Sequence, residues 1–159
     1  MPRISFSHGK TAAQITGNPL MPSKITARLM ILTAALGPAA IGAVAQGAKP
    51  ALYTADQANA GATVYAQSCG TCHGAALEGT AAPALKGTTF TDTAAAQSMT
   101  ADTLYDVISG SMPQSDPGSL KPEEYAAVTA YILQQNGYPA GAAVLAKGAP
   151  GLKDAKITP

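Results

Sequence analysis

Three stretches of the chain carry apolar residues at the spacing of a helix with one buried face. The first helix is predicted to begin near Ala55, because Thr54 and Gln57 form a capping box in which Gln57 reaches back to the helix start. It should run to about Ser68. Its apolar face has a small residue in the middle, which would let another helix cross closely. The residues of that face are Ala58, Gly61, Ala62 and Tyr65.

The second and third helices lie in the C-terminal half. One is predicted to run from Thr100, as the N-cap, to Gly110, as the residue after the last turn. The other begins with Pro122 in its first turn and ends at residues 136–137. Lys121 is a poor N-cap, so either the first turn frays or the lysine directs its charge at a partner. The buried stripes are Leu104, Val107 and Ile108 for one helix, and Tyr125, Val128, Tyr131 and Ile132 for the other.

No strand-like alternation runs for more than a few residues, so the sequence predicts an all-α domain of three to four short helices over residues 54–137. Residues 46–53 are a linker to it. Residues 74–98, rich in Gly, Ala, Pro and Thr, are too long for an ordinary connection in so small a domain. Residues 138–159 show little periodicity, so we expect a tail that is mobile or lies over the surface.

Charge divides the chain into two parts. Before residue 46 there are four basic residues and no acidic one, whereas residues 46–159 hold six Lys and nine Asp or Glu, a net charge of −3. The basic part contains an apolar run at 29–36 and ends in Ala-Val-Ala, which is typical of an export signal cleaved after Ala45. Met21 would then be the true start, and the mature protein would be periplasmic. The alternative is an uncleaved membrane anchor, although the stretch is near the lower length limit for a span. The overall charge of +1 gives no indication of nucleic-acid binding.

Both cysteines of the chain stand in Cys69-Gly70-Thr71-Cys72-His73, the signature of c-type haem attachment. Two thiols three residues apart on a helical turn lie on one face, where both can add to haem vinyl groups, and His73 follows as an iron ligand. The alternatives are a redox-active Cys pair, a short-loop disulfide and half a zinc site. A zinc site needs four ligands, and no Cys or His other than these three follows residue 45. The motif therefore predicts one covalently bound haem c.

The second axial ligand is expected to be a methionine, because His8 precedes the cleavage site and leaves no second mature histidine. Two methionines follow residue 45, Met99 and Met112. Met112 is favoured, since it follows a helix end and precedes Pro113, which restricts it to an extended backbone able to aim the thioether inward. An iron with an open sixth position is the alternative.

The mature part has few large side chains with which to build a core. It holds one Phe, and the chain has no Trp. A buried porphyrin would supply the missing apolar volume, with residues 74–98 wrapped around it and Leu77, Leu85 and Phe90 packed there. We therefore expect the haem-free chain not to pack natively.

On these residues the sequence resembles the class I (mitochondrial-like) bacterial cytochromes c, over about residues 54–137. The motifs that carry the resemblance are Cys69-x-x-Cys72-His73, Gly61 with Tyr65, Pro83-x-Leu85-x-Gly87, Met112-Pro113 and a terminal helix with Tyr131. Within the family it looks most like small cytochromes associated with periplasmic quinoprotein alcohol dehydrogenases.

The resemblance implies a cytochrome c fold in which Gly61 and Tyr131 meet where the first and last helices cross. It also implies that the Pro83 carbonyl accepts the Nδ1 hydrogen of His73, the contact that fixes the tautomer of the ligand. Aromatic residues often line the haem in such proteins, and without Trp the candidate partner of the haem propionates is Tyr105.

An iron with both axial positions filled by protein has no place for a substrate, so the sequence predicts an electron carrier and not an enzyme. Such a carrier would take single electrons from a dehydrogenase or a quinol-oxidising complex and pass them to a terminal oxidase, through weak and transient contacts. One alternative is a haem-bearing subunit of a quinoprotein dehydrogenase or oxidase complex, with residues 138–159 as its docking arm. The other is a ligand-binding cytochrome, if Met112 does not bind the iron.

Overall fold

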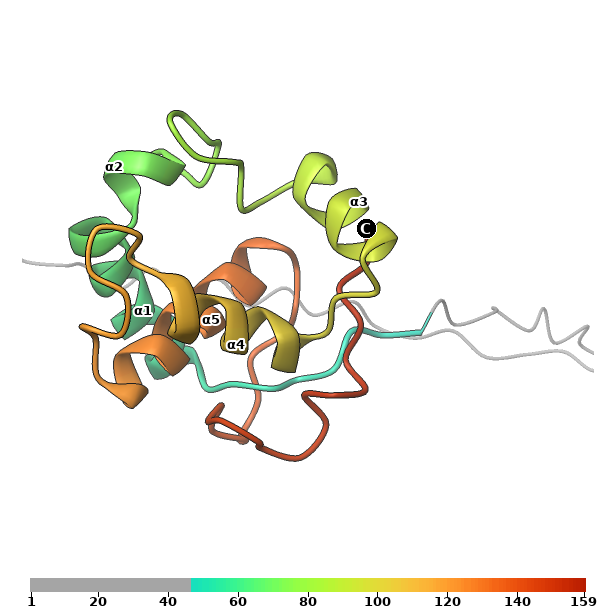
Figure 1. The fold of residues 1–159 in the computed structure, drawn as a ribbon. Helices are drawn as coiled ribbons and strands as arrows, with labels where there is room; N and C mark the ends of the chain where they lie inside the picture. Colours follow the sequence, from blue (N-terminus) through green and yellow to red (C-terminus); the bar gives the residue numbers. More distant parts are fainter. Residues whose placement is uncertain (1–46) are drawn as a thin grey trace, which may run out of the picture. The chain divides into compact units, whose positions relative to one another are not determined.

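A computed structural model describes residues 47–159 of the chain, and the predicted leader with its start at Met21 and its cleavage site after Ala45 lies outside these residues. The described part contains five helices and no strand (Figure 1). The helices are α1 (Ala55–Ser68), α2 (Gly70–His73), α3 (Thr88–Ala96), α4 (Ala101–Ser111) and α5 (Pro122–Gln135). The expected all-α fold is confirmed, with five helices in place of the expected three to four. Within residues 47–159 no helix is both long enough and apolar enough to cross a membrane.

The first and last helices cross at Gly61, as the resemblance implied. A Cβ atom at this position would lie 1.9 Å from the carbonyl oxygen of Ala127 and 3.0 Å from the Cβ of Tyr131, so only a glycine lets α1 and α5 come this close. One turn along α1, the ring of Tyr65 packs on that of Tyr131 with the centroids 5.4 Å apart. This crossing places the middle of α1 against the middle of α5, about two turns before α1 leads into the cysteine motif.

The start of α1 departs from the predicted capping box in one respect. The side chain of Thr54 accepts a hydrogen bond from the Gln57 amide at 3.2 Å, as expected of an N-cap. The side chain of Gln57 does not reach back to the helix start. Instead its Nε2 donates to the Leu145 carbonyl at 2.7 Å, and its Oε1 accepts from the Leu145 amide at 2.9 Å. Gln57 thus binds the C-terminal segment to α1.

The ends of α4 and α5 also refine the prediction. Thr100 caps α4 as expected, but the helix continues through Gly110 to Ser111, so Gly110 is not the residue that ends it. Gly110 keeps a negative φ, which leaves no left-handed turn at this position. At the start of α5, the Glu124 carboxylate accepts from the Lys121 amide at 2.8 Å, which closes the first turn in spite of the poor N-cap.

Residues 74–98 are not a helix-free connection, because α3 occupies nine of them. Phe90 and Ala94, one turn apart, are buried and give α3 its inner face. Two threonine hydroxyls donate to carbonyls of the preceding turn, Thr91 to Gly87 at 3.2 Å and Thr93 to Thr89 at 2.8 Å. These bonds satisfy the hydroxyls inside the helix, although threonine is a weak helix former.

Most of residues 138–159 are exposed, as in a segment that lies over the surface, but the segment is also anchored in the core. Its larger side chains are buried in the core: Tyr138, Leu145, Leu152 and Ile157. An antiparallel bridge joins Thr100 to Lys156, with the Ile157 amide donating to the Met99 carbonyl at 2.9 Å. The physical reason is that isolated apolar residues fill gaps beside α1 and α4 without forming a helix of their own.

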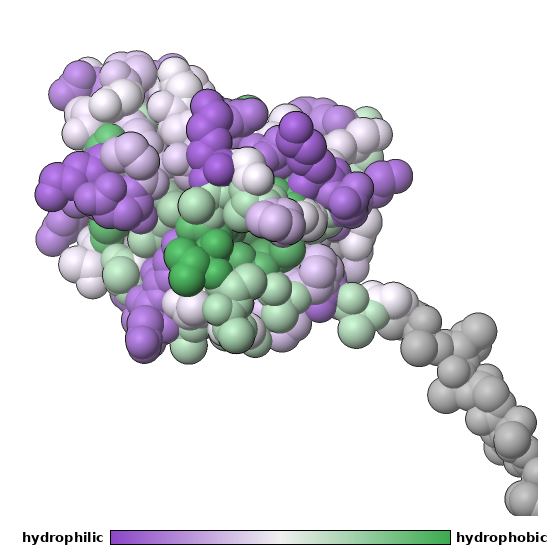
Figure 2. Space-filling model, turned by 90° about the horizontal axis from the view of Figure 1, so that it is seen from below, coloured by the Kyte–Doolittle hydropathy of each residue, from purple (hydrophilic) through white to green (hydrophobic). Residues whose placement is uncertain are grey.

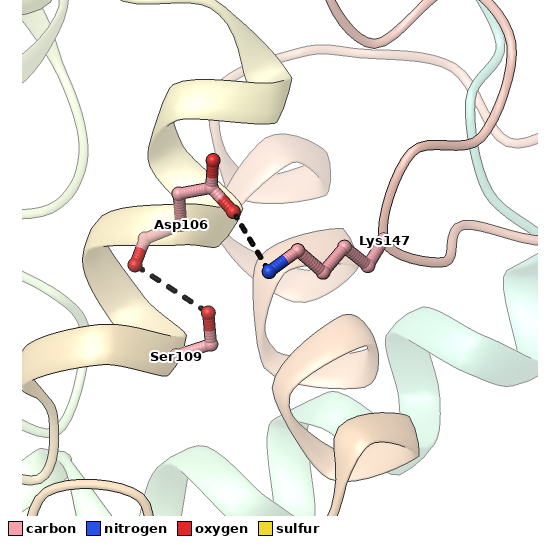
Figure 3. Close-up of polar contacts among 3 residues, drawn as sticks. All are labelled: Asp106, Ser109 and Lys147. Carbon is pink, nitrogen blue, oxygen red and sulfur yellow. Dashed lines mark hydrogen bonds and ion pairs between the residues drawn. The ribbon is translucent and has the colours of Figure 1, made fainter.

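Exposed parts of the same segment contribute little to its attachment. Lys147 forms an ion pair with Asp106 of α4 at 3.9 Å, where the Ser109 hydroxyl also donates to the Asp106 carbonyl (Figure 3). Both charged side chains are more than half exposed, so the pair adds little stability.

Viewed from below, apolar residues gather in the middle of one face with polar residues around them (Figure 2). Val144 is 65% exposed.

Candidate functional site

The cysteine motif occupies the short turn that follows α1. Cys69 ends α1, its amide donating to the Tyr65 carbonyl at 2.9 Å, and the turn α2 carries Cys72 and His73. The amides of Cys72 and His73 both donate to the Cys69 carbonyl, at 3.1 and 3.0 Å. The two thiols are free, with Cys69 half-buried and Cys72 exposed. The helical turn therefore presents both thiols and the imidazole from a single short piece of backbone.

The imidazole of His73 has a fixed tautomer. Its Nδ1 lies 2.7 Å from the Pro83 carbonyl oxygen, the contact that the resemblance implied. A carbonyl can only accept, so Nδ1 carries the proton and Nε2 is left with a free lone pair. Among residues 47–159 the structure gives Nε2 no hydrogen-bond partner. His73 is thus prepared to bind a metal through Nε2.

The loop after His73 folds back on the motif through its backbone. The Gly79 amide donates to the His73 carbonyl at 2.7 Å, and the Ala82 amide donates to the Cys72 carbonyl at 2.9 Å. The Thr80 hydroxyl donates to the same Cys72 carbonyl at 2.8 Å. Thr80 was not expected from the sequence, since a single threonine in a loop has no recognisable pattern. These bonds hold Pro83 where its carbonyl meets the imidazole.

A second bond joins α1 to this loop. Tyr65 is buried, and its hydroxyl donates to the Gly74 carbonyl at 2.6 Å. Burial, with smaller contributions from Cys69, Tyr131 and Glu78, raises the pKa of Tyr65 to about 12. The phenol is therefore a donor at any physiological pH.

The environment of the first thiol does not activate it as a nucleophile. Burial raises the pKa of the Cys69 thiol, and the neighbouring Cys72 raises it further. Reactive cysteines have a lowered pKa, because the thiolate is the nucleophile. In the part of the chain that the structure describes, no group of three or more His, Cys, Asp or Glu side chains is placed to hold a metal ion by itself. The described residues thus show neither an activated first thiol nor a cluster of three or more metal ligands.

The motif opens on a cavity of about 690 Å³ between the loop, α3, α4 and α5. All six residues predicted to bind the cofactor line it: Cys69, Cys72, His73, Pro83, Leu85 and Met112. The larger apolar side chains in the rest of the wall are Phe90, Met99, Leu104, Val107, Ile108, Val128 and Ile132, and the polar lining includes Ser68, Gln114 and Ser115. The cavity is mostly apolar, with one nitrogen ligand and two thiols at its edge.

Only some of the apolar side chains that were predicted to pack against the porphyrin line this cavity. Leu85 and Phe90 line it, whereas Leu77 is fully buried in the core and does not reach it. Val107 belongs to the predicted stripe of α4 but is 45% exposed, because it faces the cavity. Tyr105, the candidate partner of propionates, is buried and absent from the lining. The uncharged polar residues of the lining are Ser68, Gln114 and Ser115.

Both candidate methionines reach the cavity. Met99 lies between α3 and α4, and Met112 is the C-cap of α4. The backbone of Met112 is extended, with φ −122° and ψ 154°, as Pro113 was expected to impose. The cavity therefore offers a thioether from either of two places in addition to the imidazole of His73.

Comparison with known families decides what kind of domain holds this cavity. Residues 56–132 match the family model described as cytochrome c oxidase, cbb3-type, subunit III. The match indicates a c-type cytochrome domain over residues 56–132. No curated protein matches the chain, and neither does any solved structure. The cytochrome domain so matched includes all of the cavity-lining residues named above.

The residues present suit the haem c that a cytochrome domain of this type binds covalently. Two free thiols stand at the cavity edge at the required spacing, and the imidazole beside them has an unused Nε2. The cavity is of the size of a cofactor site, and its wall includes an apolar side chain that the protein leaves uncovered, Val107. Cys69 and Cys72 would hold the porphyrin through thioether bonds.

Proposed function

We propose that this cytochrome domain is a single-electron carrier, not an enzyme, whose iron has His73 and Met112 as axial ligands. The observation that carries the proposal is that His73, with its tautomer fixed by Pro83, and Met112 line one cavity together with Cys69 and Cys72. Bound haem would supply the one-electron couple, and two protein ligands leave no position for a substrate. A change of one electron then needs little rearrangement of the chain.

The residues around the cavity have separate tasks in this proposal. The Pro83 carbonyl keeps the proton on Nδ1 of His73 and so keeps Nε2 basic. The thioether of Met112 favours the reduced state, and the apolar wall excludes water from both ligands, which raises the reduction potential relative to two histidines. Cys72 is exposed, so the cofactor edge near it is the part that a redox partner would contact.

We also propose that the protein is exported and works in the periplasm, in agreement with the basic, acid-free leader sequence and with covalent haem attachment. The electron donor would be a dehydrogenase or a quinol-oxidising complex. The family match to an oxidase subunit favours a terminal oxidase as the acceptor. Contact with either partner would be small and transient.

The same match favours a second candidate function, a haem-bearing subunit that stays within an oxidase complex. Gentle solubilisation of membranes followed by size separation distinguishes the two. The carrier should be recovered as a free periplasmic protein after osmotic shock, whereas a subunit should remain with the membrane fraction and comigrate with oxidase activity.

The ligand assignment is tested on protein matured in a periplasm, through the weak far-red band that sulfur ligation gives to ferric haem. Met112→Ala should keep the covalent haem, lose this band and bind carbon monoxide when reduced, because it opens the sixth position. Met99→Ala is the matched control, since Met99 lines the same cavity, and it should keep the band. If Met99→Ala loses the band and Met112→Ala keeps it, Met99 is the ligand.

A further inference from the structure

The segment between α4 and α5 carries the proposed thioether ligand and is attached near its ends, where Met112 and Leu120 pack against the core and the Met112 amide donates to the Ile108 carbonyl at 3.0 Å. Residues 114–119 are exposed. Inside the segment, two backbone bonds form, from the Asp116 amide to the Pro113 carbonyl at 2.9 Å and from the Ser119 amide to the Asp116 carbonyl at 3.3 Å. We call residues 112–120 the ligand loop. Its position relative to the cavity must therefore be set at its two ends.

Both ends of the ligand loop meet one side chain, Tyr125 in the first turn of α5. The Tyr125 hydroxyl donates to the Met112 carbonyl at 2.8 Å, and the Leu120 amide donates to the same hydroxyl at 3.4 Å. Among the residues that the structure describes, no other side chain forms a hydrogen bond with residues 112–120. Tyr125 is buried, so its ring cannot follow the loop outward.

We infer that Tyr125 is a positioning residue for the axial methionine, an inference that rests on the proposed His73 and Met112 ligation. By binding the carbonyl of Met112 itself, the phenol fixes the backbone from which the thioether extends toward the cavity. By accepting from Leu120, it closes the loop and limits the excursions that would carry Met112 away. The two backbone bonds of Tyr125 would thereby keep the Met112 thioether at the cavity, where the iron would bind.

The test removes only the hydroxyl. Tyr125→Phe keeps the buried ring, and Tyr138→Phe is the matched control, because the buried Tyr138 donates to the Lys156 carbonyl at 2.7 Å outside the cavity lining. Added imidazole competes with the thioether for ferric haem, so its apparent affinity reports how firmly the thioether is held. In Tyr125→Phe this affinity should rise on the order of tenfold, the equivalent of one hydrogen bond, with the haem still attached. Tyr138→Phe should bind imidazole as the parent does. Equal affinities in the two variants would overturn the inference.

Met112→Ala separates this inference from the proposed function. If Met112→Ala binds imidazole no better than the parent, Met112 is not the ligand and both the ligation and the role of Tyr125 are refuted. If Met112→Ala opens the iron while Tyr125→Phe leaves the affinity unchanged, the ligation stands and the positioning role alone fails.

A measurement on the parent covers the case in which Tyr125→Phe does not mature. Displacement of the thioether by imidazole should release the Met112 carbonyl and with it the Tyr125 hydroxyl. Hydrogen exchange of the Leu120 amide should then accelerate, whereas the Gly141 amide, which donates to the Tyr53 carbonyl at 2.8 Å, should exchange as before. Unchanged exchange at Leu120 would overturn the inference.

Discussion

Individual backbone carbonyls around the cysteine motif are the points at which side chains hold it in place. The Gly74 carbonyl binds the Tyr65 hydroxyl, the Cys72 carbonyl binds that of Thr80, and the Pro83 carbonyl binds the imidazole of His73. The bonds to Gly74 and Pro83 tie the loop after His73 to α1 and α2, and the Thr80 bond ties the same loop to Cys72. Residues that do not bind the haem themselves, Tyr65, Thr80 and Pro83, thus hold the motif in place.

The stabilising effect of such a bond can be tested by removing the hydroxyl oxygen of Tyr65. Tyr65→Phe leaves the Gly74 carbonyl without its donor inside the core, so we expect the free energy of unfolding of the holoprotein to fall by about 1–2 kcal/mol. Denaturant unfolding of the ferric protein at neutral pH measures this. Tyr131→Phe is the control, because Tyr131 packs on the same ring but is only partly buried, and it should cost less.

The contribution of Tyr65 should also depend on pH. Its pKa in the folded protein is about 12, against an ordinary value of 10.0, mainly because burial disfavours the phenolate. The unfolded chain therefore loses the proton first, and the stability due to Tyr65 is complete below pH 10 and is lost as the pH rises toward 12. The difference in unfolding free energy between the parent and Tyr65→Phe should shrink over this range. A difference that stays constant to pH 12 would show that the phenol is not protected.

At the scale of the elements, the crossing of α1 and α5 depends on one missing side chain. A Cβ at Gly61 would meet backbone atoms of α5, which cannot turn aside as a flexible side chain can. Gly61→Ala should therefore separate the two helices and cost on the order of 3 kcal/mol of unfolding free energy. Gly110→Ala, on α4 with nothing within 4 Å of the added methyl group, should be neutral or stabilise the protein by up to about 1 kcal/mol. Thermal unfolding of both variants gives the comparison, and equal losses would mean that helix propensity and not the close approach governs Gly61.

The C-terminal segment is a structural element of the domain although it is not helical. Ile157 is fully buried, and its amide donates to the carbonyl of Met99 at the cavity wall. Ile157→Ala should lower the free energy of unfolding by about 2–4 kcal/mol, because it leaves a gap in a packed core. Lys147→Ala removes the exposed ion pair of the same segment with Asp106 and should cost no more than about 1 kcal/mol. A small effect of Ile157→Ala would restore the picture of a tail that merely lies on the surface.

The elements that the sequence predicted correctly are those whose signals lie within their own residues. The three amphipathic helices follow from their own spacing and caps, and the cysteine motif follows from the chemistry of haem attachment. Helix α3 was missed because four of its nine residues are Thr, and its stability comes from hydroxyl bonds and from the burial of Phe90. The burial of the C-terminal segment was missed because Leu145 has its partner, Gln57, 88 residues away. Contacts between distant segments leave no periodicity in either one.

At the scale of the whole domain, the interior formed by the described residues has two parts that differ in how completely protein atoms fill them. One is a closed core in which α1 packs against α5 and the C-terminal segment, with Tyr53, Leu133, Leu152 and Ile157 fully or almost fully buried. The other is the cavity lined by α4, the ligand loop and the loop after His73, where apolar side chains such as Val107 face open space. Protein atoms complete the first part, and a porphyrin would complete the second.

This division gives a graded expectation for the haem-free chain. Without haem, α1 and α5 keep most of their mutual contacts, whereas α4 and the ligand loop face a cavity of about 690 Å³ that lacks packing atoms. The Cys69→Ala/Cys72→Ala protein, which cannot attach haem, should therefore retain part of the helical circular dichroism of the parent but lose its sharp thermal transition and bind a hydrophobic dye. His73→Ala with both cysteines intact serves as the comparison, since thioether attachment can still place a porphyrin in the cavity and should preserve more of the cooperative transition. If the double cysteine variant melts as sharply as the holoprotein, protein side chains alone close the cavity. The fold would then not need the packing volume of the porphyrin.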